Sequence, residues 1–307
     1  MGAPLLLEVS MKKIKRQLPL HLMLLPSVIL LFIFSYVPMF GIVIAFQNYS
    51  PARGFGDSAW VGLKNFEYVF NLPSFSNVIY NTFFIAVIKM LLHLIVPVTF
   101  ALLLNELRGP GFKKSVQTIT YLPHFLSWVI LGGIFVDILS PSNGVVNIII
   151  KSLGGEPIFF LGDTKVFPWT IIVTDVWKEM GFNAVIYIAA LTGIDPTLYE
   201  AAVVDGASRW KQTTKITLPC LVPTIILLAT LSLGNVLNAG FDQVLNMYSI
   251  SVYSTGDIID TFVYRLGLKD FQFSAATAVG LFKSAISTVM IVFSYVTAYK
   301  TTGYRII

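Results

Sequence analysis

Several polar and ionisable side chains lie inside an apolar stretch of the chain, residues 166–192. They are Asp175, Trp177, Lys178, Glu179, Asn183 and Tyr187. An indole ring can stack on the flat face of a pyranose, amides bond hydroxyls, and an ammonium group pairs with a carboxylate. These residue types suit the binding of a sugar, including an anionic one. They equally suit an interhelical network in which Lys178 pairs with Asp175 and Glu179, and both interpretations stay open.

Two asparagines form a second candidate site near the end of another apolar stretch, residues 219–239. Asn235 and Asn238 are three residues apart, which would place them on one face of a helix. Polar groups inside hydrocarbon are costly, so they usually face a protein interior or a wet cavity. Because each amide both donates and accepts hydrogen bonds, we predict that the two asparagines line a passage for a hydroxyl-rich substrate.

The chain lacks the motifs that usually carry catalysis or metal binding. No GxxxxGK[ST] phosphate loop, GxSxG motif, HExxH motif or paired-cysteine pattern occurs in it. Lys89, His93 and Lys283 lie within apolar stretches, where we expect them to serve packing or interfaces. We therefore predict that the chain has no catalytic residue and binds no metal or cofactor of its own.

The composition requires an apolar solvent for most of the protein surface. Hydrophobic residues make up 55% of the chain and charged residues 12%, with a mean hydropathy of +0.76. A spanning helix needs ~20 mainly apolar residues. Six stretches meet this requirement, at about 20–46, 78–104, 116–140, 166–192, 219–239 and 273–299. The sequence thus predicts an all-α integral membrane protein with six transmembrane helices.

The distribution of Lys and Arg predicts the orientation of these spans. An even number of spans places both termini on one side, and positively charged loops are retained in the cytoplasm. With the N-terminus inside, twelve of the 21 Lys and Arg residues fall on the cytoplasmic side, six fall outside and three fall within spans. We therefore predict two cytoplasmic termini, and we interpret the net charge of +5 as a topology signal, not as a nucleic-acid footprint.

Nearly the whole chain is predicted to form one domain. Residues 1–18 are expected to be a cytoplasmic tail, with 1–10 interpreted as an upstream start or an added remnant, and residues 19–307 a single transmembrane domain. Residues 57–71 carry apolar side chains every three or four positions, which predicts a short helix lying in the membrane interface.

A polar stretch between the fourth and fifth spans, residues 195–219, has the pattern of two short helices joined at a glycine. Asp195 followed by Pro196 predicts a helix start, and Gly206 predicts the end of that helix. Ser208 can cap a second short helix. Two small helices that project from a membrane domain would form a compact knob that a partner protein can grip.

This stretch resembles the cytoplasmic EAA loop of permease subunits in binding-protein-dependent ABC importers. The matching residues, at the spacing EAA-x3-G-x9-I-x-LP, are Glu200, Ala201, Ala202, Gly206, Ile216, Leu218 and Pro219. The outer strings WVGLKNF and SPSNGVVNIIIKSLG are similar to segments of the sugar-importing group, closest to permeases for oligosaccharides or larger glycan fragments. The resemblance implies the type I importer fold of maltose and methionine permeases, in the bacterial plasma (inner) membrane.

The resemblance also implies partners and residue roles. It implies a second homologous permease subunit, two ATP-binding subunits that hold ATP and Mg²⁺, an extracytoplasmic solute-binding protein, a sugar substrate and the lipid bilayer. ATP-driven closure of the ATPases would then turn a shared cavity outward, in an alternating-access cycle. The residues that it assigns to ATPase coupling are Glu200, Ala201, Ala202, Asp205 and Gly206. Maltose-type permeases carry sugar-contacting asparagines at the depth of Asn235 and Asn238.

A different class of protein stays open as an alternative. A secondary transporter or a membrane-embedded glycan or acyl transferase could also present six spans and intramembrane charges, yet neither needs an EAA loop between its fourth and fifth spans. Secondary carriers usually contain internal repeats. Comparison of residues 20–140 with 166–299 gives no persuasive repeat, which favours the importer.

Overall fold

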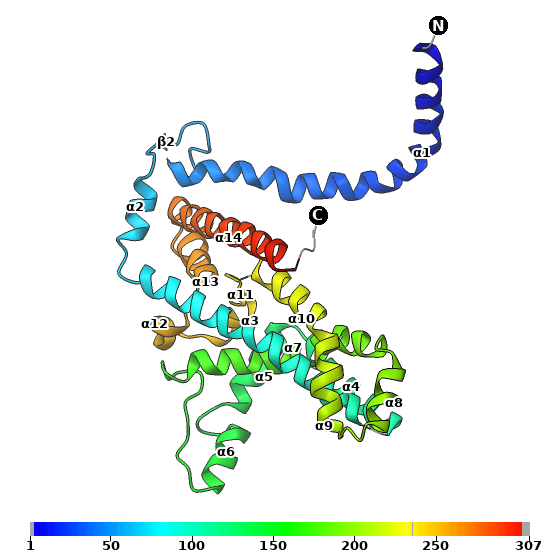
Figure 1. Cartoon of the computed structure of the whole chain (residues 1–307). Helices are drawn as coiled ribbons and strands as arrows, with labels where there is room; N and C mark the ends of the chain where they lie inside the picture. Colours follow the sequence, from blue (N-terminus) through cyan, green and yellow to red (C-terminus); the bar gives the residue numbers. More distant parts are fainter. Residues whose placement is uncertain (1–2, 108, 235, 303–307) are drawn as a thin grey trace.

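The structure, a computed structural model, describes residues 3–107, 109–234 and 236–302. Figure 1 shows a bundle of helices in which the short helices α8 and α9 lie at the opposite end from the β-hairpin. The long helices are α1 (Ala3–Leu31), α3 (Phe75–Glu106), α7 (Phe167–Thr192), α10 (Leu218–Leu233) and α14 (Phe273–Thr302). The shorter helices are α2 (Lys64–Phe70), α4 (Pro110–Tyr121), α5 (Trp128–Ile138), α6 (Val145–Ser152), α8 (Pro196–Val204), α9 (Arg209–Gln212), α11 (Phe241–Met247), α12 (Tyr253–Gly256) and α13 (Ile259–Tyr264).

Helices α3 and α7 pack along each other at the centre of the bundle. Ile85 of α3, Ile171 of α7 and Val244 of α11 are fully buried in one apolar cluster. Helices in lipid gain little from hydrophobic burial, so close packing of small residues matters more. Gly181 of α7 permits such an approach, because a Cβ there would lie 2.2 Å from the carbonyl oxygen of Thr120 in α4.

Four helical segments among the described residues are long and apolar enough to cross a membrane. They are Gln17–Phe46, Phe75–Glu106, Arg209–Leu233 and Phe273–Val296. A fifth candidate is the pair Pro110–Phe125 and Trp128–Ile138, which is bent by 105°. The predicted fourth span, α7, has 26 residues but carries Asp175, Lys178 and Glu179 in its middle, which make it too polar to qualify by composition. The architecture is that of an all-helical membrane protein with four to five candidate apolar helices.

The predicted span over residues 116–140 is not one continuous helix. Helix α4 ends at Tyr121, and a short 3-10 helix follows it (η3, Leu122–Phe125) before α5 begins at Trp128. Pro123 cannot donate a backbone hydrogen bond, which favours a break at this point. The break is stabilised by a new helix start, since the Ser127 hydroxyl accepts a hydrogen bond from a backbone N–H in the first turn of α5.

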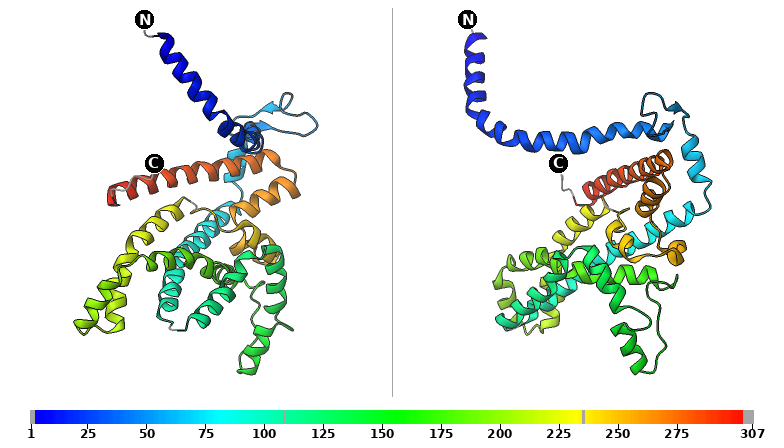
Figure 2. Two further views of the ribbon diagram at one scale, coloured as in Figure 1. Left: turned by 90° about the vertical axis from the view of Figure 1, so that its right-hand side faces the viewer. Right: turned by 180° about the vertical axis from the view of Figure 1, so that it is seen from behind.

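The first apolar segment lies along the outside of the bundle. After α1 the chain continues as a π-helix (η1, Phe32–Tyr36) and then a 3-10 helix (η2, Val37–Phe46). Only η2 of this segment packs closely on the rest, mainly on α14, and both views in Figure 2 show α1 projecting away. The large apolar side chains of this segment are therefore left for lipid or for another protein.

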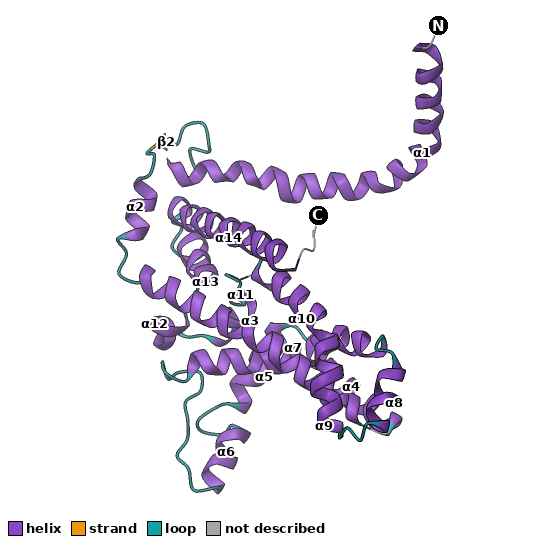
Figure 3. Ribbon diagram, viewed as in Figure 1, coloured by secondary structure: helices purple, strands orange, loops and turns teal. Residues whose placement is uncertain are grey.

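The outer segment after η2 contains the described strands. Gln47–Asn48 (β1) pairs antiparallel with Ala59–Trp60 (β2), and all other regular structure among the described residues is helical (Figure 3). The prediction of a helix across residues 57–71 is thus wrong in its first half, because the helix α2 begins only at Lys64. Trp60 lies in the strand instead, where its ring stacks on Phe46 at 5.7 Å between ring centres.

Candidate functional site

Helix α8 begins at the predicted cap. The Asp195 carboxylate accepts a hydrogen bond from the backbone N–H of Thr197 at 2.9 Å, and Pro196 occupies the first helical position. This backbone bond lowers the pKa of Asp195, because it stabilises the charged form of the side chain. The start of the loop is therefore fixed by interactions within three consecutive residues.

The glycine after α8 closes the helix in a Schellman motif. The Ala207 N–H donates to the Ala202 carbonyl at 2.8 Å, and the Gly206 N–H donates to the Val203 carbonyl at 3.0 Å. Gly206 has a φ of +70°, in the left-handed region. A side chain is disfavoured there by its backbone conformation alone, because a Cβ would meet nothing within 4 Å.

The second short helix, α9, follows directly after the turn at Gly206 and Ala207. The Ser208 hydroxyl caps it by accepting from the Lys211 N–H at 3.4 Å. The π-helix η4 (Thr213–Thr217) follows and leads into α10. A hydrogen bond of 2.9 Å between the hydroxyls of Tyr199 and Thr217 ties α8 to this segment. The prediction of two short helices that meet at a glycine is confirmed.

Three large apolar side chains of this loop are open to contact. Val203, Val204 and Trp210 are 64%, 87% and 76% exposed. The residues predicted to couple to an ATPase lie on the same helix and turn, where Glu200, Ala201, Asp205 and Gly206 are exposed and Ala202 is half-buried. Exposed large apolar side chains on both short helices are typical of a protein-binding surface.

The polar residues of α7 divide into two networks, and the first of them joins α7 to η3. Lys178, 6% exposed, donates to the Glu179 carboxylate at 2.7 Å and to the His124 carbonyl at 2.9 Å. The other Glu179 oxygen lies 2.6 Å from His124 Nδ1. The His124 ring in turn stacks on Phe182 at 3.8 Å. Lys178 and Glu179 thus satisfy each other inside the subunit.

The second network joins α7 to α3. Asn183 Nδ2 lies 3.0 Å from His93 Nδ1, and His93 Nε2 lies 2.8 Å from the Asp175 carboxylate. Lys89 Nζ lies 3.5 Å from the other Asp175 oxygen and also contacts the Gln243 side chain of α11. This chain of contacts crosses three helices. The sequence predicted packing or interface roles for Lys89 and His93, and the structure places both residues in this network of contacts.

The remaining two candidates on α7 have contrasting environments. Trp177 is 43% exposed, and the edge of its ring system contacts Phe135 of α5 at 5.7 Å between ring centres. Tyr187 is 1% exposed and lies in an apolar cluster with Ala101 of α3 and Leu221 of α10. The five predicted pathway residues of α7 therefore lie in different environments, some in the two polar networks, one half-exposed and one in an apolar cluster.

The prediction that Asn238 lies on a helix is wrong. Helix α10 ends at Leu233, with Gly234 as its C-terminal cap, and Asn238 is an exposed residue in the irregular segment 236–240, where Val236, Leu237 and Ala239 are buried. Its Oδ1 atom accepts a hydrogen bond from the Gly240 N–H at 3.3 Å. Asn235 falls outside the described residues. The segment cannot continue as a helix through Gly240, which has a φ of +93°.

Lys89 holds this irregular segment in place from α3. Its ammonium group donates to the Ala239 carbonyl at 2.8 Å and to Gln243. Gln243, fully buried, donates to the Ile171 carbonyl and to Thr174 of α7, both at 2.8 Å. The segment that carries Asn238 is thus anchored to both central helices.

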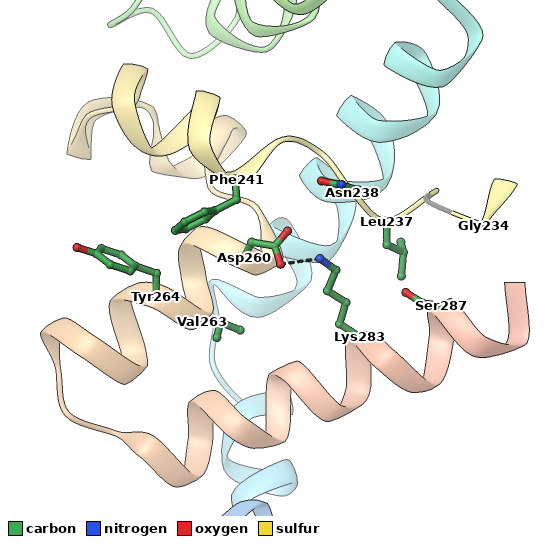
Figure 4. Close-up of a pocket in the computed structure, with 9 residues that line it drawn as sticks. All are labelled: Gly234, Leu237, Asn238, Phe241, Asp260, Val263, Tyr264, Lys283 and Ser287. Carbon is green, nitrogen blue, oxygen red and sulfur yellow. Dashed lines mark hydrogen bonds and ion pairs between the residues drawn. The ribbon is translucent and has the colours of Figure 1, made fainter. Parts of the chain in front are cut away.

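Asn238 lines a cavity of about 640 Å³ between the end of α10 and the helices α11, α13 and α14 (Figure 4). Its other lining residues are Gly234, Leu237, Phe241, Asp260, Val263, Tyr264, Lys283 and Ser287. Asp260 and Lys283 form an ion pair of 2.5 Å within it. Sequence reasoning missed Asp260 and assigned Lys283 to packing. An intramembrane lysine needs a partner, and that signal could have prompted a search for a carboxylate.

Comparisons with known proteins agree on one family. Residues 98–300 match the family described as "Binding-protein-dependent transport system inner membrane component". The chain is 43% identical over 279 residues to the polygalacturonan/rhamnogalacturonan transport system permease protein YteP of Bacillus subtilis (strain 168), across 91% of this chain and 87% of that protein. It is 42% identical to Protein LplB of the same organism, across 92% of this chain and 88% of that protein.

Solved structures give the same result for the fold. The chain superposes with a TM-score of 0.87 and 40% identity on a bacterial ABC transporter involved in the import of the acidic polysaccharide alginate, across 95% of this chain and 98% of that chain. A second structure, of a bacterial alginate ABC transporter in complex with an alginate pentasaccharide-bound periplasmic protein, superposes with a TM-score of 0.86 and 40% identity, across 95% and 97% of the two chains.

Proposed function

Because this chain belongs to the family of binding-protein-dependent transport system inner membrane components, we propose that it is the permease subunit of an ATP-driven sugar importer. It moves an oligosaccharide or a larger glycan fragment from a solute-binding protein into the cytoplasm. The exposed helix–glycine–helix knob carries this proposal, since an importer needs a surface through which an ATPase can move the membrane domain. The named substrates of the relatives support a glycan as cargo.

The proposed assembly contains this chain, a second and different permease subunit, two ATP-binding subunits and an extracytoplasmic binding protein. The chain crosses the membrane six times with both termini in the cytoplasm, α7 forming the polar fourth span. Its paired charges support this place for α7, because a spanning helix can carry ionisable residues when neighbouring helices neutralise them. The exposed apolar first segment offers surface for the second permease subunit.

The proposed cycle is alternating access driven through the loop at 195–219. ATP binding closes the two ATPases, draws the two permease knobs together and opens the shared cavity outward, and hydrolysis reverses the movement. Glu200 and Asp205 present carboxylates to the ATPase, Ala201 and Ala202 allow close approach, and Gly206 sets the angle between α8 and α9. ATP and Mg²⁺ belong to the partner subunits.

The proposed substrate pathway runs past the exposed members of the candidate set. Asn238 lines the cavity below α10, and Trp177 offers a half-exposed ring on another face of the subunit. Asn235 belongs to the same proposal by its position in the chain. The other candidates on α7 hold this helix against its neighbours and so position the pathway without contacting the substrate. They are Lys178, Glu179, Asn183 and Tyr187.

Reconstitution tests the proposal against its alternative. The chain is purified with its co-expressed partners, placed in lipid vesicles and supplied with ATP and a loaded binding protein. We expect co-elution of a peripheral ATPase and ATP-dependent uptake of labelled oligosaccharide. Uptake driven by a proton or sodium gradient through the isolated chain would contradict the proposal and favour a secondary transporter.

A further inference from the structure

An ion pair without a role in the cycle above lies in the cavity beside Asn238. Lys283 of α14 and Asp260 of α13 are joined at 2.5 Å, and their side chains remain 22% and 26% exposed. Among the described residues, Asp260 is the sole hydrogen-bond partner of Lys283. An ammonium group has three N–H donors, so Lys283 keeps donors for a ligand that enters the cavity.

The depth of Lys283 makes its presence informative. It lies ten residues after Phe273, the first residue of α14, which corresponds to ~15 Å along a helix and to about half of a ~30 Å hydrocarbon core. A charge at that depth is costly unless it faces protein or water. Neutral hydroxyl groups can be bound by amides and hydroxyls at lower cost, so an ammonium group with free N–H donors in an open cavity favours a ligand with negative charge.

The rest of the cavity fits a sugar ring. Phe241 and Tyr264 lie together on one side of the ion pair, with ring centres 5.8 Å apart (Figure 4), and such rings pack on the apolar face of a pyranose. The Asn238 Oδ1 atom is engaged by the Gly240 N–H, which leaves its amide nitrogen to donate to a ligand. The cavity thus combines an aromatic wall, hydrogen-bond donors and a cation.

We propose that this cavity is a subsite for a uronate unit, the acidic sugar residue of an anionic oligosaccharide. The ligand carboxylate takes the Lys283 ammonium group from Asp260, and the released Asp260 carboxylate accepts a hydrogen bond from a neighbouring sugar hydroxyl. In the empty state Asp260 neutralises Lys283, so the site exchanges one anionic partner for another. This inference rests on the proposed function, because it names the substrate class of that importer.

The exchange gives each residue a different expected effect on binding. Lys283→Met removes the cation and should weaken binding of an acidic sugar by about tenfold or more, the range of a charge-assisted hydrogen bond. Asp260→Asn removes the competing anion and should strengthen the same binding. The double variant Asp260→Asn/Lys283→Met leaves no unpaired charge, which protects folding, and should bind the acidic sugar no better than its neutral form.

The experiment uses the assembled transporter in nanodiscs without its binding protein, and it measures the Kd of trigalacturonate and of its methyl ester. The wild type should prefer the free acid, and the double variant should lose that preference while its affinity for the ester stays within about twofold. Lys283→Arg should retain the preference. Lys165→Met, which removes an exposed lysine outside the cavity, is the matched control and should leave both affinities unchanged.

Three results would overturn the uronate subsite. They are a wild type with no preference for the acid, a double variant that keeps the preference, and an equal loss of both ligands in the double variant, which would indicate a purely structural ion pair. Failure of the proposed function is a separate result. A wild type that imports no glycan, when it is supplied with a loaded binding protein and ATP, would contradict the proposed function irrespective of the Kd values.

Discussion

The glycine between α8 and α9 provides the sharpest test of coupling. Gly206 has a φ of +70°, a conformation that costs an ordinary L-residue about 1–2 kcal/mol and is worse for a β-branched one. An added Cβ meets nothing within 4 Å, so no clash of that atom adds to the backbone cost of Gly206→Val. We expect the substitution to destabilise the native loop by about 2 kcal/mol.

A change of that size alters the population of the native loop by a factor of up to about 30. The loop projects from one end of the bundle (Figure 1), so the membrane domain itself should fold and melt as the wild type does. The assay is ATP hydrolysis stimulated by the loaded binding protein in reconstituted vesicles, with co-elution of the ATPase as a measure of assembly. Gly206→Val should reduce stimulated hydrolysis several-fold and weaken co-elution, with the Tm unchanged.

Gly206→Asn separates backbone conformation from side-chain bulk. Asparagine enters the left-handed region at little cost, so this variant should retain most of the stimulated hydrolysis, with Gly206→Ala between it and Gly206→Val. Wild-type coupling in Gly206→Val would refute the reasoning. An asparagine variant as defective as the valine variant would also refute it, because the loss would then follow from any side chain at the contact surface.

Three further predictions concern the groups that hold the loop and the bundle. Asp195→Ala should speed hydrogen exchange at the Thr197 amide. Because the pKa of Asp195 is lowered in the folded state, its cap stabilises α8 at a pH above the pKa that Asp195 has in the open loop, and this stabilisation is lost as the pH falls through the folded-state pKa. The difference in exchange between variant and wild type should therefore vanish in acid. Lys89→Met leaves Asp175 without its cation and should cost about 3–5 kcal/mol, measured as a lower Tm that Lys89→Met/Asp175→Asn partly restores. Gly181→Val places a Cβ 2.2 Å from a carbonyl of α4 and should reduce the folded yield, whereas wild-type yield would contradict the close packing.

The two short helices of the loop at 195–219 were predictable because their signals are local. Asp195, Pro196, Gly206 and Ser208 each act through backbone groups no more than five positions away, so their effects are visible in the sequence itself. The long apolar helices were predictable for a similar reason, since hydropathy is summed over neighbouring residues. A helix end set by its own caps needs no knowledge of the tertiary structure.

The conformation after α10 was only partly predictable, because Gly234 and Gly240 are local signals for a helix end but one anchoring contact comes from a distant part of the chain. Residues 219–239 are apolar throughout most of their length and suggest one continuous helix, yet Lys89 binds the Ala239 carbonyl from a position 150 residues away. The Asp260–Lys283 pair was missed for the same reason, since Asp260 lies in a stretch that hydropathy assigns to an outer loop. Sequence likewise left the role of Lys178 open, because its partner His124 belongs to another helix.

Helix α10 connects the two candidate sites directly. Its first residue follows the η4 segment that Tyr199 ties to α8, and its 16 residues extend for ~24 Å to Gly234 at the rim of the cavity. Beyond the cavity rim, Lys89 fixes Ala239 to the central helices. A movement of the loop at 195–219 would therefore be transmitted along α10 toward the irregular segment 236–240, which carries Asn238. The proposed substrate contact and the proposed ATPase contact thus lie near the two ends of one helix, which would give loop movement a direct route to change the shape of the cavity.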